Sequence, residues 1–303
     1  MYDIVIIGAG TAGLSAAIYG VRAGKKVLVL ECGNYGGQII NSPEVENYPG
    51  LPRVTGFEFA TGLYEQAKQL GANIEYEEVT GIEKTGTDFV IATEEQDIRC
   101  HAVVIATGAK NRPLGVAREE ELVGAGVSYC ATCDGAFYKN RVAAVIGGGS
   151  TALEDAGVLS GYCKKVYIVH RRDEFRGEQW LVSSLEKKDN VEFVLNAVVD
   201  EILGDSVVQG IRVKDTKTGE KRDIAVDGIF VAIGQMPDNK AFADIVDLDK
   251  GGYVIASEDC KTSTEGIFVA GDCRTKNVRQ LATAAADGAV AGLAACDYIN
   301  RNE

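Results

Sequence analysis

The sequence is poor in several residue types that whole classes of protein require. Its 303 residues include two histidines, one tryptophan and eight cysteines, and only one pair of cysteines is closely spaced. Eight cysteines are too few for a disulfide scaffold, and no second close Cys or His pair is present to complete a zinc site. We therefore expect no metal site. The 31 Lys and Arg residues are outnumbered by 44 Asp and Glu, and the resulting net charge of −13 argues against nucleic acid or anionic membrane as a partner.

Long hydrophobic runs are also lacking. No apolar run approaches the ~18 residues that a membrane span needs. The strand-like run at 3–7 leaves no room for a secretory leader, so we expect a cytoplasmic protein. Because cytoplasmic thiols are kept reduced, the close pair Cys130 and Cys133 is interpreted as a redox dithiol, with zinc ligation and a structural disulfide as the weaker readings.

Glycine, in contrast, is abundant, and two glycine-rich turns organise the chain. The first turn lies between an apolar strand at 4–7 and a helical stretch at 14–23, and the next strand, at 26–30, is closed by Glu31. Glu31 stands 31 − 10 = 21 positions after Gly10, the second glycine of a Gly-x-Gly-x-x-Gly pattern. This context predicts FAD or NAD, with its pyrophosphate on the turn and its ribose hydroxyls on Glu31. The turn residues assigned to this cofactor are Gly8, Gly10, Ala12 and Gly13.

The second turn repeats this arrangement after the strand at 141–146, before a helix at 152–159 and a strand at 165–169. Here 170 − 149 = 21, so His170 takes the place that Glu31 has in the first module, and arginines follow it. Guanidinium groups match a phosphate bidentately where a carboxylate repels it, so this module is predicted to bind NADPH through its 2′-phosphate. The assigned residues are Gly147, Gly149, Ser150, Thr151, His170, Arg171, Arg172 and Arg176.

Other patterns complete a two-domain α/β chain. Residues 105–108 and 231–234 are similar apolar strands with glycine ends, each followed shortly by a proline. Before the first of them we expect a helix at 57–70 and strands between 73 and 93 that are split at Gly81 and Gly86. A strand at 267–272 and an alanine-rich helix at 280–298 follow the second module. We place one domain boundary at 113 and the other at 240.

Several motifs, taken together and in order, resemble those of the low-molecular-weight, bacterial-type thioredoxin reductases. These FAD- and NADPH-dependent enzymes are pyridine nucleotide-disulfide oxidoreductases, and the resemblance covers essentially the whole chain. The motifs are Cys-Ala-Thr-Cys-Asp-Gly at 130–135, Gly-Gly-Gln at 36–38, Glu-Val-Glu-Asn-Tyr-Pro-Gly at 44–50, His-Arg-Arg-Asp-Glu-Phe-Arg at 170–176, Gly-Asp at 271–272 and Arg-Gln at 279–280.

The resemblance implies two Rossmann-like, three-layer domains, with one domain inserted into the other. The FAD-binding domain is discontinuous, at 1–113 and 241–303, and the NADPH-binding domain at 114–240 carries the dithiol. The same resemblance places further residues around FAD, with Asp272 on the ribityl chain. They are Gly37, Gln38, Asn47, Thr107, Gly108, Asp272, Arg279, Gln280 and Leu281.

The resemblance also implies a homodimeric enzyme and a path for its electrons. They pass from NADPH through FAD to Cys130 and Cys133 and then to thioredoxin or a thioredoxin-like protein. Cys133 is the thiol nearer the flavin and the one that exchanges with the partner, and Asp134 is the general acid. Because the dithiol must reach both the flavin and a protein substrate, the family's rotation of the NADPH domain is expected on linkers near Pro113 and Asn239.

Two alternatives stay open. The acceptor is either thioredoxin or another small dithiol carrier, glutaredoxin-like or peroxiredoxin-linked. The alternative from a different functional class is a non-catalytic flavoprotein that senses redox state. Such a protein would not need binding sites for two dinucleotides, and both sets of residues are present here. The chain departs from the family at Glu265-Gly266, where Pro-Gly is common, and in the additional thiols Cys260 and Cys273.

Overall fold

The structure, a computed structural model, describes residues 1–42 and 44–302. The chain forms two compact units: unit 1 contains residues 1–110 and the chain from 236 onward, and unit 2 contains residues 111–235. The chain thus crosses between units at 110–111 and 235–236, a few residues before each boundary predicted from sequence. Short strands lie at these crossings and pair with each other: β7 (Lys110–Asn111) and β16 (Gln235–Met236).

Unit 1 is built on a seven-stranded sheet of order β3-β2-β1-β6-β5-β4, with β17 pairing the second half of β6. The strands β3, β2, β1, β6 and β17 are parallel, and β5 and β4 are antiparallel. Valine, isoleucine and leucine fill the central strands because both faces of the sheet are buried. The strands are β1 (Tyr2–Ile7), β2 (Val27–Leu30), β3 (Asn73–Glu75), β4 (Val79–Thr85), β5 (Asp88–Thr93), β6 (Asp97–Ile105) and β17 (Ile267–Val269).

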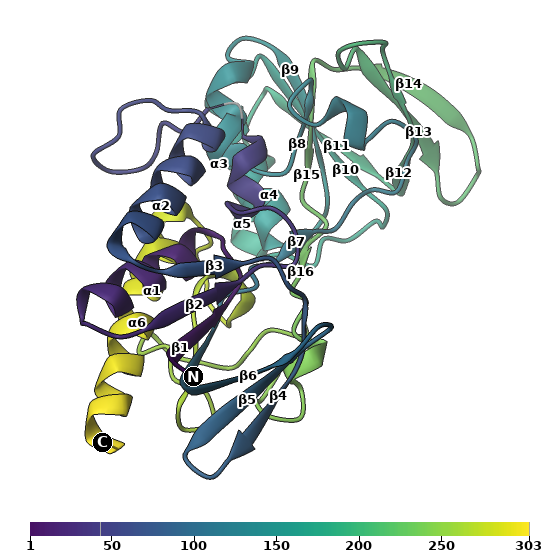
Figure 1. Ribbon diagram of the computed structural model, residues 1–303. Helices are drawn as coiled ribbons and strands as arrows, with labels where there is room; N and C mark the ends of the chain where they lie inside the picture. Colours follow the sequence, from purple (N-terminus) through teal and green to yellow (C-terminus); the bar gives the residue numbers. More distant parts are fainter. Residues whose placement is uncertain (43, 303) are drawn as a thin grey trace. The chain divides into compact units, whose positions relative to one another are not determined.

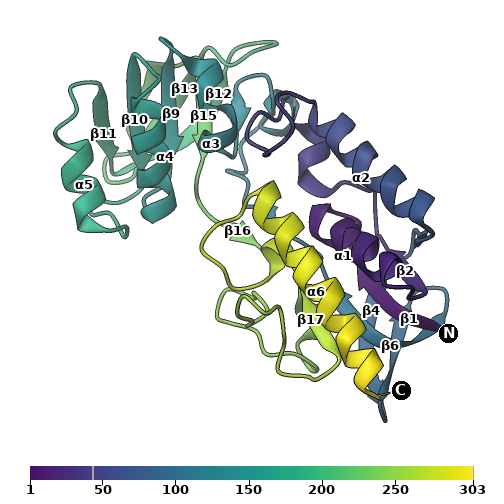
Figure 2. The ribbon, with the colours of Figure 1, turned by 90° about the vertical axis from the view of Figure 1, so that its left-hand side faces the viewer.

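The α-helices in the described part of unit 1 are α1 (Thr11–Arg22), α2 (Gly56–Leu70) and α6 (Leu281–Asn302). Figures 1 and 2 show α1 and α6 side by side. Their close approach depends on glycine, because a methyl group on Gly288 would lie 2.2 Å from the Ala12 carbonyl oxygen. The helix α2 begins with a capping box in which the Thr55 hydroxyl and the Glu58 carboxylate each accept a backbone N–H of the other residue.

Unit 2 has three layers. Its parallel sheet has the order β11-β10-β9-β15-β8, and an antiparallel sheet has the order β12-β13-β14. Figures 1 and 2 show α3, α4 and α5 on one face of the parallel sheet and the antiparallel sheet on the other. The elements are β8 (Val127–Ser128), α3 (Ala131–Asp134), β9 (Val142–Ile146), α4 (Ser150–Ser160), β10 (Lys165–His170), α5 (Gln179–Leu185), β11 (Val191–Leu195), β12 (Ala197–Leu203), β13 (Gly210–Asp215), β14 (Lys221–Ala225) and β15 (Gly228–Val231).

Most predicted elements are present, with ends displaced by a few residues. One expectation was wrong: Gly81 does not separate two strands but lies inside β4, where the pairing with β5 shifts register between Val79 and Gly81. A glycine without a side chain tolerates such an irregularity without ending the strand. Gly86 does lie in the turn that joins β4 to β5. Within 1–42 and 44–302, no helix is long and apolar enough to cross a membrane.

A buried ion cluster ties the start of the last helix to the strand end before it. Asp287, on the buried face of α6, accepts hydrogen bonds from Arg274 Nε and Nη2 at 2.8 and 2.9 Å and from Lys276 Nζ at 2.9 Å. The Gly271 N–H donates to the same carboxylate at 3.0 Å. Arg274 and Asp287 are only 1% and 5% exposed. Burial alone raises the pKa of Asp287, but these two cations lower it overall.

Removal of the Asp287 carboxylate should therefore destabilise the folded protein. In Asp287→Ala two buried cations lose their buried carboxylate partner, and we expect the free energy of unfolding to fall by roughly 3–5 kcal/mol. The matched control is Glu258→Ala, because Glu258 contacts the same Arg274 at 3.2 Å but its side chain is 90% exposed. That variant should lose at most about 1 kcal/mol. Denaturant unfolding of both variants makes the comparison, and equal losses would contradict it.

Candidate functional site

The close cysteine pair forms a disulfide at the start of the short helix α3. Cys130 and Cys133 are joined, and both are half-buried. Two hydrogen bonds from backbone N–H groups define the turn between them. The Cys133 N–H donates to Cys130 Sγ at 3.2 Å, and the Asp134 N–H donates to the Cys130 carbonyl at 3.1 Å. A disulfide that is not sealed in the core can be reached by an electron donor or a partner thiol.

Asp134 follows this disulfide directly, and its carboxyl group is mostly buried. Ser128 Oγ donates a hydrogen bond to Asp134 Oδ2 at 2.6 Å. The other oxygen, Oδ1, is buried and has no hydrogen-bond partner among the described residues. Burial raises the pKa of Asp134, and the bond from Ser128 opposes that rise. A carboxyl group held in this way can keep a proton that an ordinary surface aspartate would lose.

The other six cysteines do not resemble this pair. Burial raises the pKa of Cys100 and Cys260 to about 12 and that of Cys163 to about 11. Cys273 and Cys296 are also buried, and burial raises the pKa of each. Cys32 is exposed, but partial burial and the nearby Glu31 carboxylate still raise its pKa. These thiols stay protonated, so the additional cysteines have the character of small apolar residues.

The first glycine turn joins β1 to α1 by contacts that exclude side chains. A methyl group on Gly8 would lie 2.4 Å from the Ala106 carbonyl oxygen, and one on Gly13 would lie 1.9 Å from the Gly8 carbonyl oxygen. The Cβ position of Gly10 is open, with no protein atom within 4 Å. Glu31, at the end of β2, accepts the Ala9 N–H at 2.7 Å and thereby fixes the turn. Open space over a turn at a helix N-terminus suits a pyrophosphate.

The second turn, between β9 and α4, reproduces the first. A methyl group on Gly147 would lie 2.3 Å from the Ala232 carbonyl oxygen, as Gly8 meets Ala106 in unit 1. Gly149 has an open Cβ position like that of Gly10. Ser150 opens the helix, and its Oγ accepts the Glu178 N–H at 3.3 Å, while Thr151 is exposed in the first turn. The similar strand ends at 105–108 and 231–234 therefore have the same role in both units, because each supplies the carbonyl that the first glycine of the turn packs against.

The basic segment lies beside this second turn. Arg171, Arg172 and Arg176 are exposed, and no described residue forms a hydrogen bond or ion pair with their guanidinium groups. The Arg176 N–H donates to the Gly148 carbonyl at 2.8 Å, which ties the segment to the turn. His170 differs from the arginines, because it is only 7% exposed and its ring stacks on Phe175. Burial lowers the pKa of His170, so the imidazole is neutral at physiological pH.

A third group of predicted residues meets at the C-terminal end of β17. Asp272, in the 3₁₀ turn Gly271–Cys273, has a buried Oδ1 with no partner among the described residues. Burial raises its pKa, although Lys276 and Arg279 oppose the rise. Arg279 donates to the Asp272 carbonyl at 3.3 Å, and its guanidinium lies over the Tyr253 ring. Leu281 begins α6 just beyond.

The remaining predicted residues of unit 1 lie on loops, in a 3₁₀ turn and in the first turn of α1. Asn47 Nδ2 donates to Gln280 Oε1 at 3.1 Å, so two residues 233 positions apart are brought together. Thr107 Oγ1 donates to Asn239 Oδ1 at 2.8 Å, and Gly108 follows with an open Cβ position. Gly37 and Gln38 open the 3₁₀ turn Gly37–Asn41, where the Gly37 Cβ position lies 3.5 Å from Gly10 Cα. Ala12 is buried in the first turn of α1.

Three polar residues with structural roles at these sites were not assigned from the sequence. Ser128 holds Asp134, and Asp287 holds the Gly271 N–H. Asn239, 1% exposed, accepts from Thr107 and donates to the carbonyls of Gly252 and Cys273. Only Asp287 carried a usable signal, since it is the single acid on the stripe of alanines and glycines that α6 buries.

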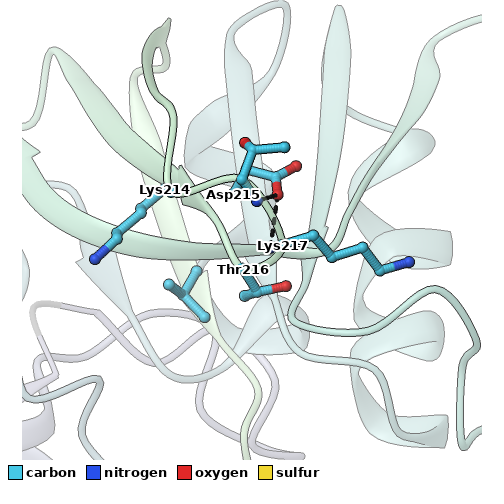
Figure 3. Close-up of a pocket in the computed structure, with 7 residues that line it drawn as sticks. Lys214, Asp215, Thr216 and Lys217 are labelled. Carbon is cyan, nitrogen blue, oxygen red and sulfur yellow. Dashed lines mark hydrogen bonds between the residues drawn. The ribbon is translucent and has the colours of Figure 1, made fainter.

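One surface hollow of unit 2 is lined by none of the predicted site residues. It measures about 520 Å³ at the turn between β13 and β14 in unit 2. Figure 3 shows Lys214 and Lys217 pointing away from each other there, while Asp215 Oδ1 accepts the turn N–H groups of Lys217 and Thr218. The hollow therefore has no convergent polar set. Across the part of the chain that the structure describes, no cluster of three or more His, Cys, Asp or Glu side chains could hold a metal ion.

Comparison with known proteins agrees with the arrangement of turns and disulfide. Residues 2–289 match the profile of the pyridine nucleotide-disulphide oxidoreductase family. The thioredoxin reductase of Listeria monocytogenes is 44% identical over 301 residues, which is 99% of this chain and 94% of that protein. The thioredoxin reductase of Treponema pallidum is 42% identical over 99% of this chain and 97% of its own.

Solved structures extend the likeness to the fold. The crystal structure of thioredoxin reductase from Streptococcus pyogenes has a TM-score of 0.94 and 40% identity, with 99% of each chain covered. The thioredoxin reductase from Giardia duodenalis has a TM-score of 0.92 and 33% identity, again over 99% of both chains. The chain therefore belongs to the pyridine nucleotide-disulphide oxidoreductases and, within them, to the thioredoxin reductase family. The predicted α/β class with two Rossmann-like domains is confirmed.

Proposed function

We propose that this chain is an NADPH-dependent thioredoxin-disulfide reductase whose electrons leave through Cys130 and Cys133. One observation supports the proposal above the others. Among residues 1–42 and 44–302, the buried side-chain oxygens that lack a hydrogen-bond partner are Asp134 Oδ1 and Asp272 Oδ1. Each unpartnered oxygen costs free energy in the folded protein, and each belongs to a residue that the sequence assigns to chemistry or to a cofactor.

The residues of unit 1 fit FAD. The open Cβ position of Gly10 leaves room for the pyrophosphate, and Glu31, already held by the Ala9 N–H, keeps lone pairs for ribose hydroxyls. Asp272 Oδ1 is a buried acceptor in need of a donor, as a ribityl hydroxyl would be. The other proposed residues around the cofactor are Gly8, Ala12, Gly13, Gly37, Gln38, Asn47, Thr107, Gly108, Arg279, Gln280 and Leu281.

The residues of unit 2 fit NADPH. Gly149 leaves open space over the N-terminus of α4, and Arg171, Arg172 and Arg176 present guanidinium groups that no described residue neutralises. A 2′-phosphate would give these cations a bidentate partner. Buried and neutral, His170 lies under Gly148, where a methyl group would come within 2.1 Å of its Nδ1. We infer that His170 supports the turn from below while the arginines bind the phosphate.

FAD held by these residues would supply the chemistry that accepts a hydride from NADPH and returns two electrons to the disulfide. The released dithiol then carries out thiol–disulfide exchange. The Cys133 thiolate attacks one sulfur of the partner's disulfide, forms a mixed disulfide and displaces the partner's other sulfur, which takes a proton from Asp134. The Cys130 thiol then loses its proton to solvent and attacks Cys133 Sγ, which restores the disulfide of the chain. The partner's second sulfur leaves as a thiolate and takes up a proton from solvent, so the partner is released as a dithiol.

The dithiol must also change its surroundings during this cycle. It belongs to unit 2, whereas the proposed FAD residues belong to unit 1, and a protein substrate needs the same sulfurs exposed. We therefore propose that unit 2 rotates between the half-reactions on the segments near Pro113 and Asn239. Two crossings at 110–111 and 235–236 are a sufficient connection for hinge motion.

We also propose a cytoplasmic homodimer. Unit 1 exposes apolar side chains on all three of its helices, from Tyr19 on α1 and Phe57 on α2 to Val290 and Leu293 on α6. A groove of about 380 Å³ lies among these helices and is lined mostly by alanine, tyrosine and other apolar residues, with Ser15 and Gln66 as its polar side chains. A second copy of the chain is the proposed partner for this face.

Substitution of one sulfur tests the proposed function. Cys133→Ser should abolish NADPH-dependent reduction of a thioredoxin disulfide, while NADPH still bleaches the yellow flavin. The matched control is Cys32→Ser, since Cys32 is exposed and lies outside the proposed electron path. It should turn over like the unmodified protein. Thioredoxin reduction that survives in Cys133→Ser would place the dithiol off the path.

A second test concerns nucleotide choice. NADPH should bleach the flavin far more readily than NADH. In Arg171→Ala or Arg172→Ala the affinity for NADPH should fall about 10- to 100-fold, because a hydrogen bond to a charged group contributes ~1.5–3 kcal/mol, and the NADH response should not change. Arg222→Ala, an exposed arginine on β14, serves as control. Stopped-flow flavin absorbance measures all of these, and equal bleaching of the unmodified protein by both nucleotides would overturn the assignment.

A further inference from the structure

Ser128 connects the central sheet of unit 2 to the dithiol turn. It is the last residue of β8, where it pairs with Phe230 of β15, and it is only 4% exposed. Its backbone is therefore fixed by the sheet, two residues before Cys130. The strand pairing therefore holds the Ser128 Cα and Cβ atoms in a fixed position next to the turn.

The hydroxyl of Ser128 has two well-formed hydrogen bonds. It accepts a hydrogen bond from the Cys130 N–H at 3.1 Å and donates one to Asp134 Oδ2 at 2.6 Å. A contact to the Cys130 carbonyl, at 3.4 Å, is much longer. A distance of 2.6 Å lies in the range of a hydrogen bond from a hydroxyl to an ionised carboxylate. The single proton of the hydroxyl is thus directed at Oδ2.

This geometry distinguishes the two oxygens of Asp134. Oδ2 is occupied by the serine proton, whereas Oδ1 is buried with no partner in the described structure. When the carboxyl group is protonated, its proton therefore belongs on Oδ1, the oxygen that is free to give it away. We propose that Ser128 is a positioning residue that fixes the Asp134 carboxyl beside the disulfide and leaves Oδ1 as the proton-donating atom.

The inference rests on the proposed function, because Asp134 matters only if the dithiol exchanges with a partner. Within that function Ser128 influences the pKa of the Asp134 carboxyl group. Burial raises the pKa of Asp134, and the hydrogen bond from Ser128 is the influence that lowers it. Without the hydroxyl the buried carboxylate has no remaining hydrogen-bond donor among the described residues, so its pKa must rise further.

Other titratable groups lie on the elements that pack against α3. They are Tyr138 in the 3₁₀ turn Gly135–Tyr138, and Glu154 and Asp155 in α4. Burial raises the pKa of Tyr138, so it stays protonated near neutrality. Burial and the Glu154 charge raise the pKa of Asp155 to about 7, so Asp155 also has a raised pKa and itself titrates near neutrality. A test must therefore separate Asp134 from Asp155.

The test is the pH dependence of kcat/KM for thioredoxin reduction by the FAD-loaded enzyme. An acid acts while protonated, so activity falls as pH rises through its pKa. Ser128→Ala should move this alkaline limb upward by about one pH unit or more, since it removes a hydrogen bond to a charged group. Ser128→Thr keeps a hydroxyl in a strand position that accepts a β-branched residue, and its limb should stay with that of the unmodified protein.

Two further variants show which carboxyl group, Asp134 or Asp155, produces the alkaline limb of the pH profile. Asp155→Asn in the Ser128→Ala background should leave the upward shift in place, whereas Asp134→Asn in that background should remove it. A limb that stays in place in Ser128→Ala, or that moves equally in Ser128→Thr, would overturn the inference. An unmodified protein that reduces no thioredoxin would instead overturn the proposed function, so the two failures are distinguishable.

Discussion

Two backbone contacts that are too close for any side chain determine the architecture of both units. Gly8 meets the Ala106 carbonyl in unit 1, and Gly147 meets the Ala232 carbonyl in unit 2. Each contact presses a strand-to-helix turn against the end of the neighbouring strand, and each leaves an open space over the helix N-terminus next to it. Two dinucleotides in one chain, and hence an electron path between them, depend on that repeated contact.

Two carboxyl groups next to the proposed chemistry are buried without a full set of hydrogen bonds. Asp272 and Asp134 each keep one buried oxygen unpartnered in the described structure, at a cost in stability. Their neighbours are, by contrast, well bonded. Asp287 binds two cations and a backbone N–H behind the Gly271 turn, and Ser128 holds Asp134 from the edge strand β8. The packing therefore leaves polar groups open where a cofactor or a proton transfer is proposed.

The strand–turn–helix units could be predicted because their signals are local. Glycine spacing, an acid or a histidine 21 positions later and an apolar strand before the turn all lie within about thirty residues. Gly81 misled because a glycine inside a strand and a glycine that ends one look alike in sequence. The pairings of Asn47 with Gln280 and of Thr107 with Asn239 join residues more than a hundred positions apart, which no local pattern reveals. Ser128 was missed because nothing in a serine's neighbours shows where its hydroxyl points.

The central claim is that the flavin and the Cys130–Cys133 disulfide form one electron path. Anaerobic titration with NADPH, followed by flavin absorbance and thiol counting, tests it most directly. The account predicts that each chain takes up four electrons, two on the flavin and two on the disulfide, with two new thiols appearing and none appearing in Cys133→Ser. Uptake of only two electrons, with the disulfide intact and the flavin fully reduced, would contradict it.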